Sequence, residues 1–110
     1  MPKRPPAPAK TLFGRRLREA RQRVGIAQDK LGVMIGLDEG CSSARMSRYE
    51  SGAHEPPFLW VERMAAALGV PPAYFYCDDD RLAEIVRVYA GLPEEKRQAL
   101  LDYVTRLNTL

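Results

Sequence analysis

Apolar residues recur at helical spacing along most of the chain. Between positions 11 and 25 they fall at i, i+4, i+7 and i+11, on a face formed by Phe13, Leu17, Ala20 and Val24. A glycine follows this stretch at position 25, where the left-handed end of a helix favours one. No segment alternates between polar and apolar residues in the manner of a half-buried strand. The pattern therefore predicts an all-α protein.

Four more short helices are expected before residue 77. The second runs from about Ala27 to Ile35, and its inward residues are expected to be Leu31, Met34 and Ile35. A polar connection over residues 37–41 leads to a third helix, capped by Ser42 or Ser43 and ending near Glu50. Proline at position 57 suits the first turn of a fourth helix, which ends at residue 68. Its buried face is expected to hold Leu59, Trp60, Met64, Ala67 and Leu68. A short fifth helix ends at Tyr76.

Two amphipathic helices are predicted after the acidic run at residues 78–80. They are separated by a turn at Gly91 and Leu92, and the second opens with a proline and two glutamates. Their apolar stripes are formed by Leu82, Ile85, Val86 and Tyr89, and by Leu100, Leu101, Val104 and Leu107. Since five helices can bury their own core, we expect these stripes to form a homodimer interface. Alternatively, they fold back on the fourth and fifth helices.

Positive charge is concentrated at the beginning of the chain. Residues 1–26 carry eight lysines and arginines against one glutamate, whereas the whole chain has a net charge of +3. Residues 1–10 also hold four of the nine prolines, so we expect a flexible basic arm there. Such a distribution favours a polyanionic partner or, equally, a solubilising tail.

Several classes of function lack support in the sequence. His54 has no cysteine or acidic cluster at metal-ligand spacing, and Cys41 and Cys77 are expected to be reduced thiols. We find no nucleophile–base pair and no phosphate-binding glycine loop, so neither an enzyme nor a cofactor is expected. No apolar run approaches the length of a membrane span or a secretory signal, which predicts a cytoplasmic, nucleoid-associated protein.

The predicted third helix has the two faces that a DNA-binding helix needs. Met46, Tyr49 and Glu50 would face inward, leaving small and positively charged residues outside. Small side chains permit close approach to base edges, and Arg48 is long enough for a bidentate contact with guanine.

Two segments carry a resemblance to a known family. Ile26-Ala27-Gln28-Asp29-Lys30-Leu31-Gly32 and Met46-Ser47-Arg48-Tyr49-Glu50-Ser51-Gly52, with the proline loop and Leu68-Gly69-Val70 that follow, resemble the lambda-repressor-like (Cro/XRE) helix-turn-helix family. The resemblance, which covers about residues 11–76, implies a five-helix DNA-binding domain over residues 11–77. The two amphipathic helices predicted from their apolar stripes then form a C-terminal helical hairpin over residues 78–110.

The family pattern also implies residue roles. The implied DNA-contacting residues are Gln28, Ser42, Ser43, Ala44, Arg45, Ser47, Arg48 and Gly52. Gln28 and the backbone amide of Gly52 would contact phosphates, whereas the third-helix residues would contact bases or phosphates. Arg21 and Glu50 match a structural ion pair that sets the pose of the third helix.

This chain departs from the family pattern in two places. About four residues, Asp38 to Cys41, are inserted before the third helix. Because their carboxylates would repel phosphate, we expect them to form a loop that is directed away from DNA or that binds something else. The loop after the third helix offers only His54, beside Glu55, where basic residues are common in the family.

These observations predict a transcriptional regulator, specifically a repressor, that binds double-stranded DNA as a homodimer on a palindromic operator. The alternative is an antitoxin-like protein or phage regulatory adaptor that acts mainly through protein partners. About 30 residues follow position 78, too few for a separate sensory domain.

Overall fold

Helices account for all the secondary structure of residues 6–109, which are the residues described by the computed structural model. In chain order they are α1 (Leu12–Val24), α2 (Gln28–Met34), α3 (Glu39–Ser51), α4 (Phe58–Leu68), the 3-10 helix η1 (Pro72–Tyr76), α5 (Asp80–Ala90) and α6 (Glu94–Leu107). The prediction of an all-α fold is confirmed. None of these helices combines the length and the apolar character needed to cross a membrane.

Most helix ends follow the local chemistry of the sequence. Thr11 caps α1 by accepting a 3.0 Å hydrogen bond from the Gly14 amide, and Gly25 ends it at a φ of 82°. The loop predicted over residues 37–41 is wrong, because α3 already begins at Glu39. Asp38 is its N-cap residue, and a carboxylate in the first turn is favoured by the helix dipole. Ser42 and Ser43 therefore lie inside the helix and do not cap it.

One core is shared by α1 to α4, η1 and part of α5. Its fully buried side chains include Leu17, Leu31, Met46, Met64 and Phe75. Three residues predicted to be buried are exposed instead: Val24, Met34 (58%) and Leu59 (54%). In α4 the buried positions are Val61, Met64, Ala65 and Leu68. They follow the i, i+3, i+4, i+7 helical period from Val61 rather than from Leu59.

Very close approach of α2 to α3 depends on a small residue in each helix. A Cβ atom on Gly32 would lie 1.9 Å from Oγ of Ser42 and 2.9 Å from Cγ of Met46. Ser42 is fully buried, and its hydroxyl donates a 2.6 Å hydrogen bond to the carbonyl of Asp29. This contact fixes the orientation of α3 relative to α2.

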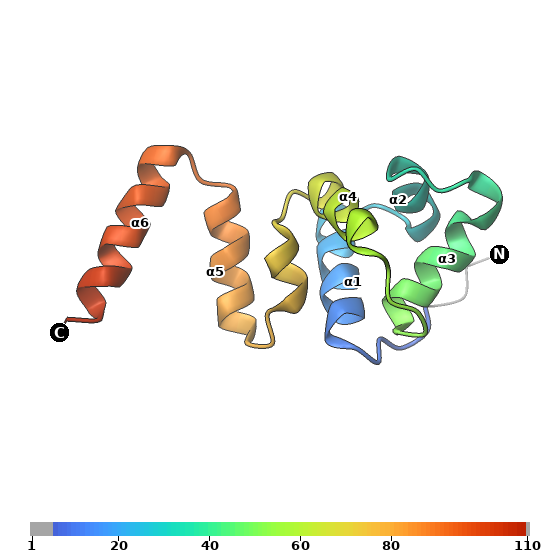
Figure 1. Cartoon of the computed structure of the whole chain (residues 1–110), viewed down its shortest axis with the longest axis horizontal. Coiled ribbons are helices and arrows are strands. Elements are labelled where there is room, and N and C mark those ends of the chain that lie inside the picture. The colour runs from blue at the N-terminus through green and yellow to red at the C-terminus, as the bar shows by residue number, and fades with distance from the viewer. Residues whose placement is uncertain (1–5, 110) are drawn as a thin grey trace.

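The two C-terminal helices differ in how they pack. On α5, Ala83 is buried in the common core and Val86 packs against it. No residue of α6 is buried, and Figure 1 shows this helix standing away from the rest of the molecule. The radius of gyration is accordingly 15.9 Å, compared with about 13 Å for a compact chain of similar length. The helical core thus continues past the predicted boundary at residue 78 as far as α5.

Candidate nucleic-acid interface

The outward face of α3 is composed of small residues and two arginines. Ser43, Ala44, Arg45 and Arg48 are exposed and Ser47 is half-buried, and we call these five residues the recognition face. On the opposite side of the helix Met46, Tyr49 and Glu50 are buried, as the pattern predicts. At the end of the molecule farthest from α6, the α2–α3 pair lies open to solvent (Figure 1).

Two residues predicted to contact DNA form hydrogen bonds within the protein instead. Ser42 lies in the α2–α3 interface, so it cannot reach a ligand on the surface. The amide of Gly52 donates to the carbonyl of Arg48 at 3.1 Å, which closes the end of α3. Glycine is required at position 52 by a φ of 89° and by Thr11, whose Cγ2 would lie 2.5 Å from an added Cβ. Both predictions are corrected accordingly.

Of the four residues that the family resemblance marks as an insert, Asp38 is the N-cap of α3 and the other three form its first turn. The orientation of the recognition face is set by Met46, Tyr49 and Glu50, which are buried on the opposite side of α3. The expected loop directed away from DNA is therefore replaced by an acidic helix end, with Asp38 and Glu39 both exposed. These carboxylates lie along the same helix as the recognition face.

A buried carboxylate on α3 binds two arginines of α1. Glu50 is fully buried, and Arg21 donates to it from Nε at 2.5 Å and from Nη2 at 3.2 Å. Arg18 adds a 2.9 Å bond from its Nε to Oε1 of Glu50. The ion pair implied by the resemblance is thus present, with a second arginine that the sequence analysis missed. The signal was available, because positions 18 and 21 share one face of a helix.

Gln28 lies in the first turn of α2, where backbone amides and the helix dipole favour an anion. Its Nε2 is buried and donates to no acceptor among residues 6–109. A buried donor without a protein partner is unfavourable, so a small rotation towards a phosphate oxygen would satisfy it.

Much of the positive charge on α1 is already neutralised within the protein. Arg15 and Arg16 bind Glu19 and Asp80, in addition to the two arginines that bind Glu50. The concentration of charge noted in the sequence therefore does not form a free cationic surface on this helix. Arg23 is the exposed arginine of α1 that has no ion pair within the described residues, and further exposed positive charge lies on Lys30, Arg45 and Arg48, around the α2–α3 pair.

Part of the basic arm packs beside the end of α3. The amide of Lys10 donates to the carbonyl of Ser51 at 3.0 Å, and Arg18 donates to the carbonyl of Ala7. The flexible arm stays a prediction, with these two contacts at the end of the arm that adjoins α1. Lys3 and Arg4, which complete the positive charge of the arm, lie outside the described residues.

Comparisons with known proteins agree with this arrangement of helices. Residues 12–74 match a family model described as a helix-turn-helix domain. Among solved structures, the crystal structure of transcriptional regulator BswR is similar, with a TM-score of 0.80 and 40% sequence identity over 84% of this chain and 92% of that chain. No curated protein matches the sequence.

Proposed function

This chain belongs to the helix-turn-helix domain family, in its lambda-repressor-like (XRE) type, and we propose that it is a transcriptional regulator that binds double-stranded DNA sequence-specifically. The recognition face carries this proposal. It offers small residues that allow close approach, with two exposed arginines for base edges and phosphates. The similarity to a solved transcriptional regulator supports it.

We assign a separate task to each part of the interface. Arg48, with Ser43, Ala44 and Ser47 beside it, would contact base edges in the major groove. Gln28 and Arg45 would bind phosphates on either side of the groove. Glu50, held by its two arginines, keeps α3 at a fixed angle to α1 and so positions the recognition face without contacting DNA.

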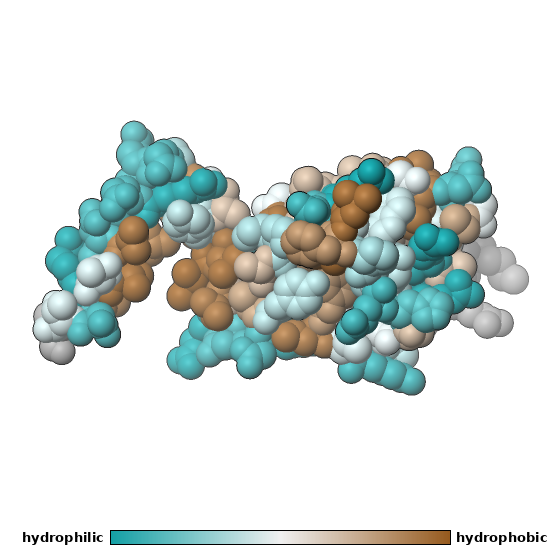
Figure 2. Space-filling model, viewed as in Figure 1, coloured by the Kyte–Doolittle hydropathy of each residue, from teal (hydrophilic) through white to brown (hydrophobic). Residues whose placement is uncertain are grey.

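We further propose that the protein acts as a homodimer on a palindromic operator. Large hydrophobic side chains are exposed on α5 and α6: Leu82, Ile85, Val88, Tyr89, Leu101, Tyr103, Val104 and Leu107. Figure 2 shows hydrophobic residues on the side of α6 that faces α5, across an open notch in the surface. Apolar surface of this extent favours burial against another surface, and a symmetric dimer is the commonest soluble assembly.

The predicted dimer residues do not all share this exposure. Val86 packs against the core of its own chain and Leu100 is half-buried, so the fold-back alternative applies in part to α5.

A dimer bound across an operator would exclude other proteins from that DNA, which is why we propose repression as its mode.

Selection of bound sites from random duplex DNA tests the proposal. We expect a motif with two-fold symmetry, its half-sites separated by one helical turn of about 34 Å or a multiple of it. Enrichment of an asymmetric motif would contradict the dimer but not DNA binding. Failure to enrich any motif, with no salt-dependent affinity for random DNA, would favour the alternative in which the protein acts through protein partners.

A further inference from the structure

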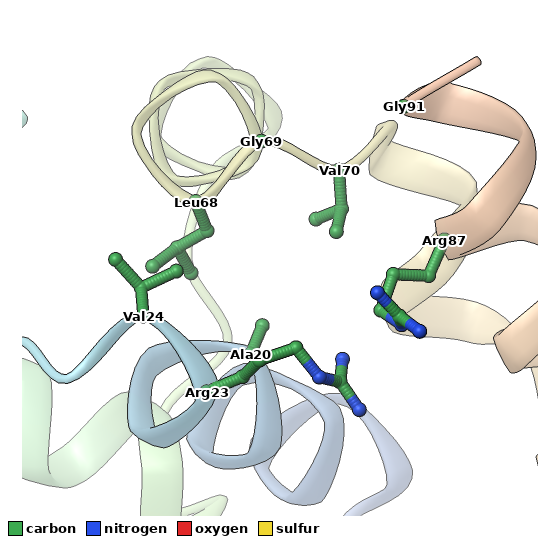
Figure 3. Close-up of a pocket in the computed structure, with 8 residues that line it drawn as sticks. All are labelled: Ala20, Arg23, Val24, Leu68, Gly69, Val70, Arg87 and Gly91. Atoms are coloured by element: carbon green, nitrogen blue, oxygen red, sulfur yellow. The ribbon is translucent and has the colours of Figure 1, made fainter.

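An arginine-lined cavity lies where the DNA-binding domain meets the C-terminal helices. It has a volume of about 180 Å³ and is bounded by α1, by the connection after α4 and by α5. This volume equals that of about six water molecules, which suits a small ligand. Figure 3 shows the side chains of Arg23 from α1 and Arg87 from α5 extending towards one another across it.

The charge of this cavity is unbalanced. Guanidinium groups are always protonated, so two permanent positive charges face one small space. Arg87 binds Glu84, which is half exposed, whereas Arg23 forms no direct ion pair with any residue between positions 6 and 109. The Glu84 carboxylate also interacts with the charge of Arg23 at longer range, so the two arginines share one carboxylate and one positive charge is left over. The remaining lining is mostly aliphatic side chain and glycine, with no carboxylate.

Tyr74 supplies a third polar group beside the two arginines. Its side chain is buried, and its hydroxyl accepts a hydrogen bond from Nη1 of Arg23 at 3.4 Å. Tyr74 does not itself line the cavity, so its part is to hold the guanidinium of Arg23 in place.

We propose that this cavity binds a small oxyanion, either inorganic phosphate or a short carboxylate. Guanidinium forks bind both groups through charge-assisted hydrogen bonds. Glu84 holds Arg87 through Nε and Nη2, which leaves Nη1 of Arg87, together with the guanidinium of Arg23, to bind a ligand. The cavity walls come from both parts of the molecule. Given the proposed function, an occupant would fix the C-terminal helices relative to the recognition face and so alter operator affinity.

Binding is tested on the full-length protein in the absence of DNA. Sodium phosphate and sodium succinate are titrated separately at constant ionic strength, with sodium chloride as the reference, and amide resonances are followed by NMR. We expect saturable shifts at Gly69 and Gly91 with at least one of the two anions. Arg23→Gln and Arg87→Gln should each weaken binding about tenfold or more, since each removes a charge-assisted bond. Arg81→Gln, on the same helix as Arg87 and 93% exposed, is the matched control.

Tyr74→Phe keeps the buried ring and removes only the hydroxyl, so it should weaken binding several-fold without unfolding the protein. Shifts that do not saturate, that chloride reproduces, or that persist in the Arg23→Gln Arg87→Gln double variant would overturn the proposal. So would a fall in the salt dependence of random-DNA binding in Arg23→Gln, because this arginine would then be a DNA backbone contact. DNA binding is measured separately, so failure of the anion site leaves the proposed function untouched.

Discussion

Arg16 on α1 donates a 2.9 Å hydrogen bond from Nη2 to Oδ1 of Asp80, the first residue of α5. Its Nε donates at 2.8 Å to the carbonyl of Cys77, so one buried guanidinium holds both sides of the junction. Arg15 reaches the same carboxylate oxygen at 3.1 Å. The acidic run at residues 78–80 thus contains the residue that attaches α5 to the DNA-binding domain.

Replacing Asp80 with asparagine should loosen α5 and remove a pH dependence. Hydrogen bonds from Arg15 and then Arg16 lower the pKa of Asp80 below its ordinary value of 3.8. A carboxylate whose pKa is depressed by folding stabilises the fold above its unfolded pKa, and this contribution is lost as the pH falls through the folded pKa. We therefore expect the amides of α5 to exchange faster in Asp80→Asn than in the unaltered protein at neutral pH, and the difference to vanish in acid.

Asp78→Asn, at an exposed position two residues earlier, is the matched control and should leave exchange in α5 unchanged. Equal exchange rates in Asp80→Asn and the unaltered protein at neutral pH would show that this ion pair does not attach the helix.

Replacing Glu50 with alanine should destabilise the whole domain. Arg21 is buried and would lose its charged partner, and breaking a buried pair from one side costs about 3–5 kcal/mol. Urea unfolding followed by circular dichroism measures this change. Glu62→Ala, on the exposed side of α4, should fall within about 0.5 kcal/mol of the unaltered protein. A Glu50→Ala protein with ordinary stability and DNA affinity would refute the positioning role.

The sequence predicts the helices well because their signals are local. Caps such as Thr11 and Gly25 act on their own helix, and the period of apolar residues does not depend on the rest of the fold. The sequence predicts a loop in place of the first turn of α3, because glycine and acidic residues such as those around Gly40 are common in loops. In a helix the same acids are stabilised by the dipole at its beginning.

The interface is harder to predict because it depends on the packing of separate helices. From the sequence, Ser42 is expected to be an exposed polar residue, but α2 packs against it. The period of apolar residues cannot show that Gly32 allows α2 to lie so close to α3. Likewise, the arginines of α1 suggest a DNA-binding surface when only the sequence is considered. In the fold they form ion pairs with Glu50 and Asp80, which come from distant parts of the chain. A sequence shows which residues carry charge, but only the fold shows which charges remain free.

Replacing Arg48 with alanine should reduce specificity as well as affinity. If this arginine forms a bidentate contact with a base, we expect a loss of about 1–3 kcal/mol on the selected operator and a relaxed preference at one position. Fluorescence anisotropy on operator and random duplexes separates the two effects, with Arg81→Ala as a control away from the interface. An equal loss on both duplexes would identify Arg48 as a phosphate contact only.

Neutralising the beginning of α3 should strengthen non-specific binding. Asp38 and Glu39 are exposed beside the recognition face, and their repulsion of phosphates opposes association. The Asp38→Asn Glu39→Gln double variant should bind random duplex DNA several-fold more tightly at low salt, and the gain should shrink as salt screens the charges. Glu94→Gln with Glu95→Gln makes the same charge change at the beginning of α6 and should have a smaller effect. Weaker operator binding in the first variant would instead indicate that a carboxylate accepts from a cytosine amino group.

The site of truncation decides whether the dimer interface can be tested cleanly. Removal of all residues after Asp79 would delete Asp80 and leave the buried Arg16 without one of its partners. It would also remove Ala83 from the core. Ending the chain after Leu92 avoids both effects, because α6 buries no residue in its own chain.

A chain that ends at Leu92 should be a folded monomer with weak operator binding. Its core is intact, so its helical signal and unfolding midpoint should remain close to those of one full-length subunit, while the exposed side chains of α6 no longer bind a second copy. Loss of the second DNA-binding domain should weaken binding to a palindrome about 100-fold or more, but binding to a single half-site only slightly. Sedimentation at micromolar concentration measures the assembly.

Leu101→Glu should also convert the full-length dimer to a monomer, whereas Thr109→Glu at the exposed end of the chain should not. A full-length monomer would refute the dimer. A truncated chain that still dimerises would show that α6 is not needed, and would leave the exposed side chains of α5 as the part of the proposed interface that remains.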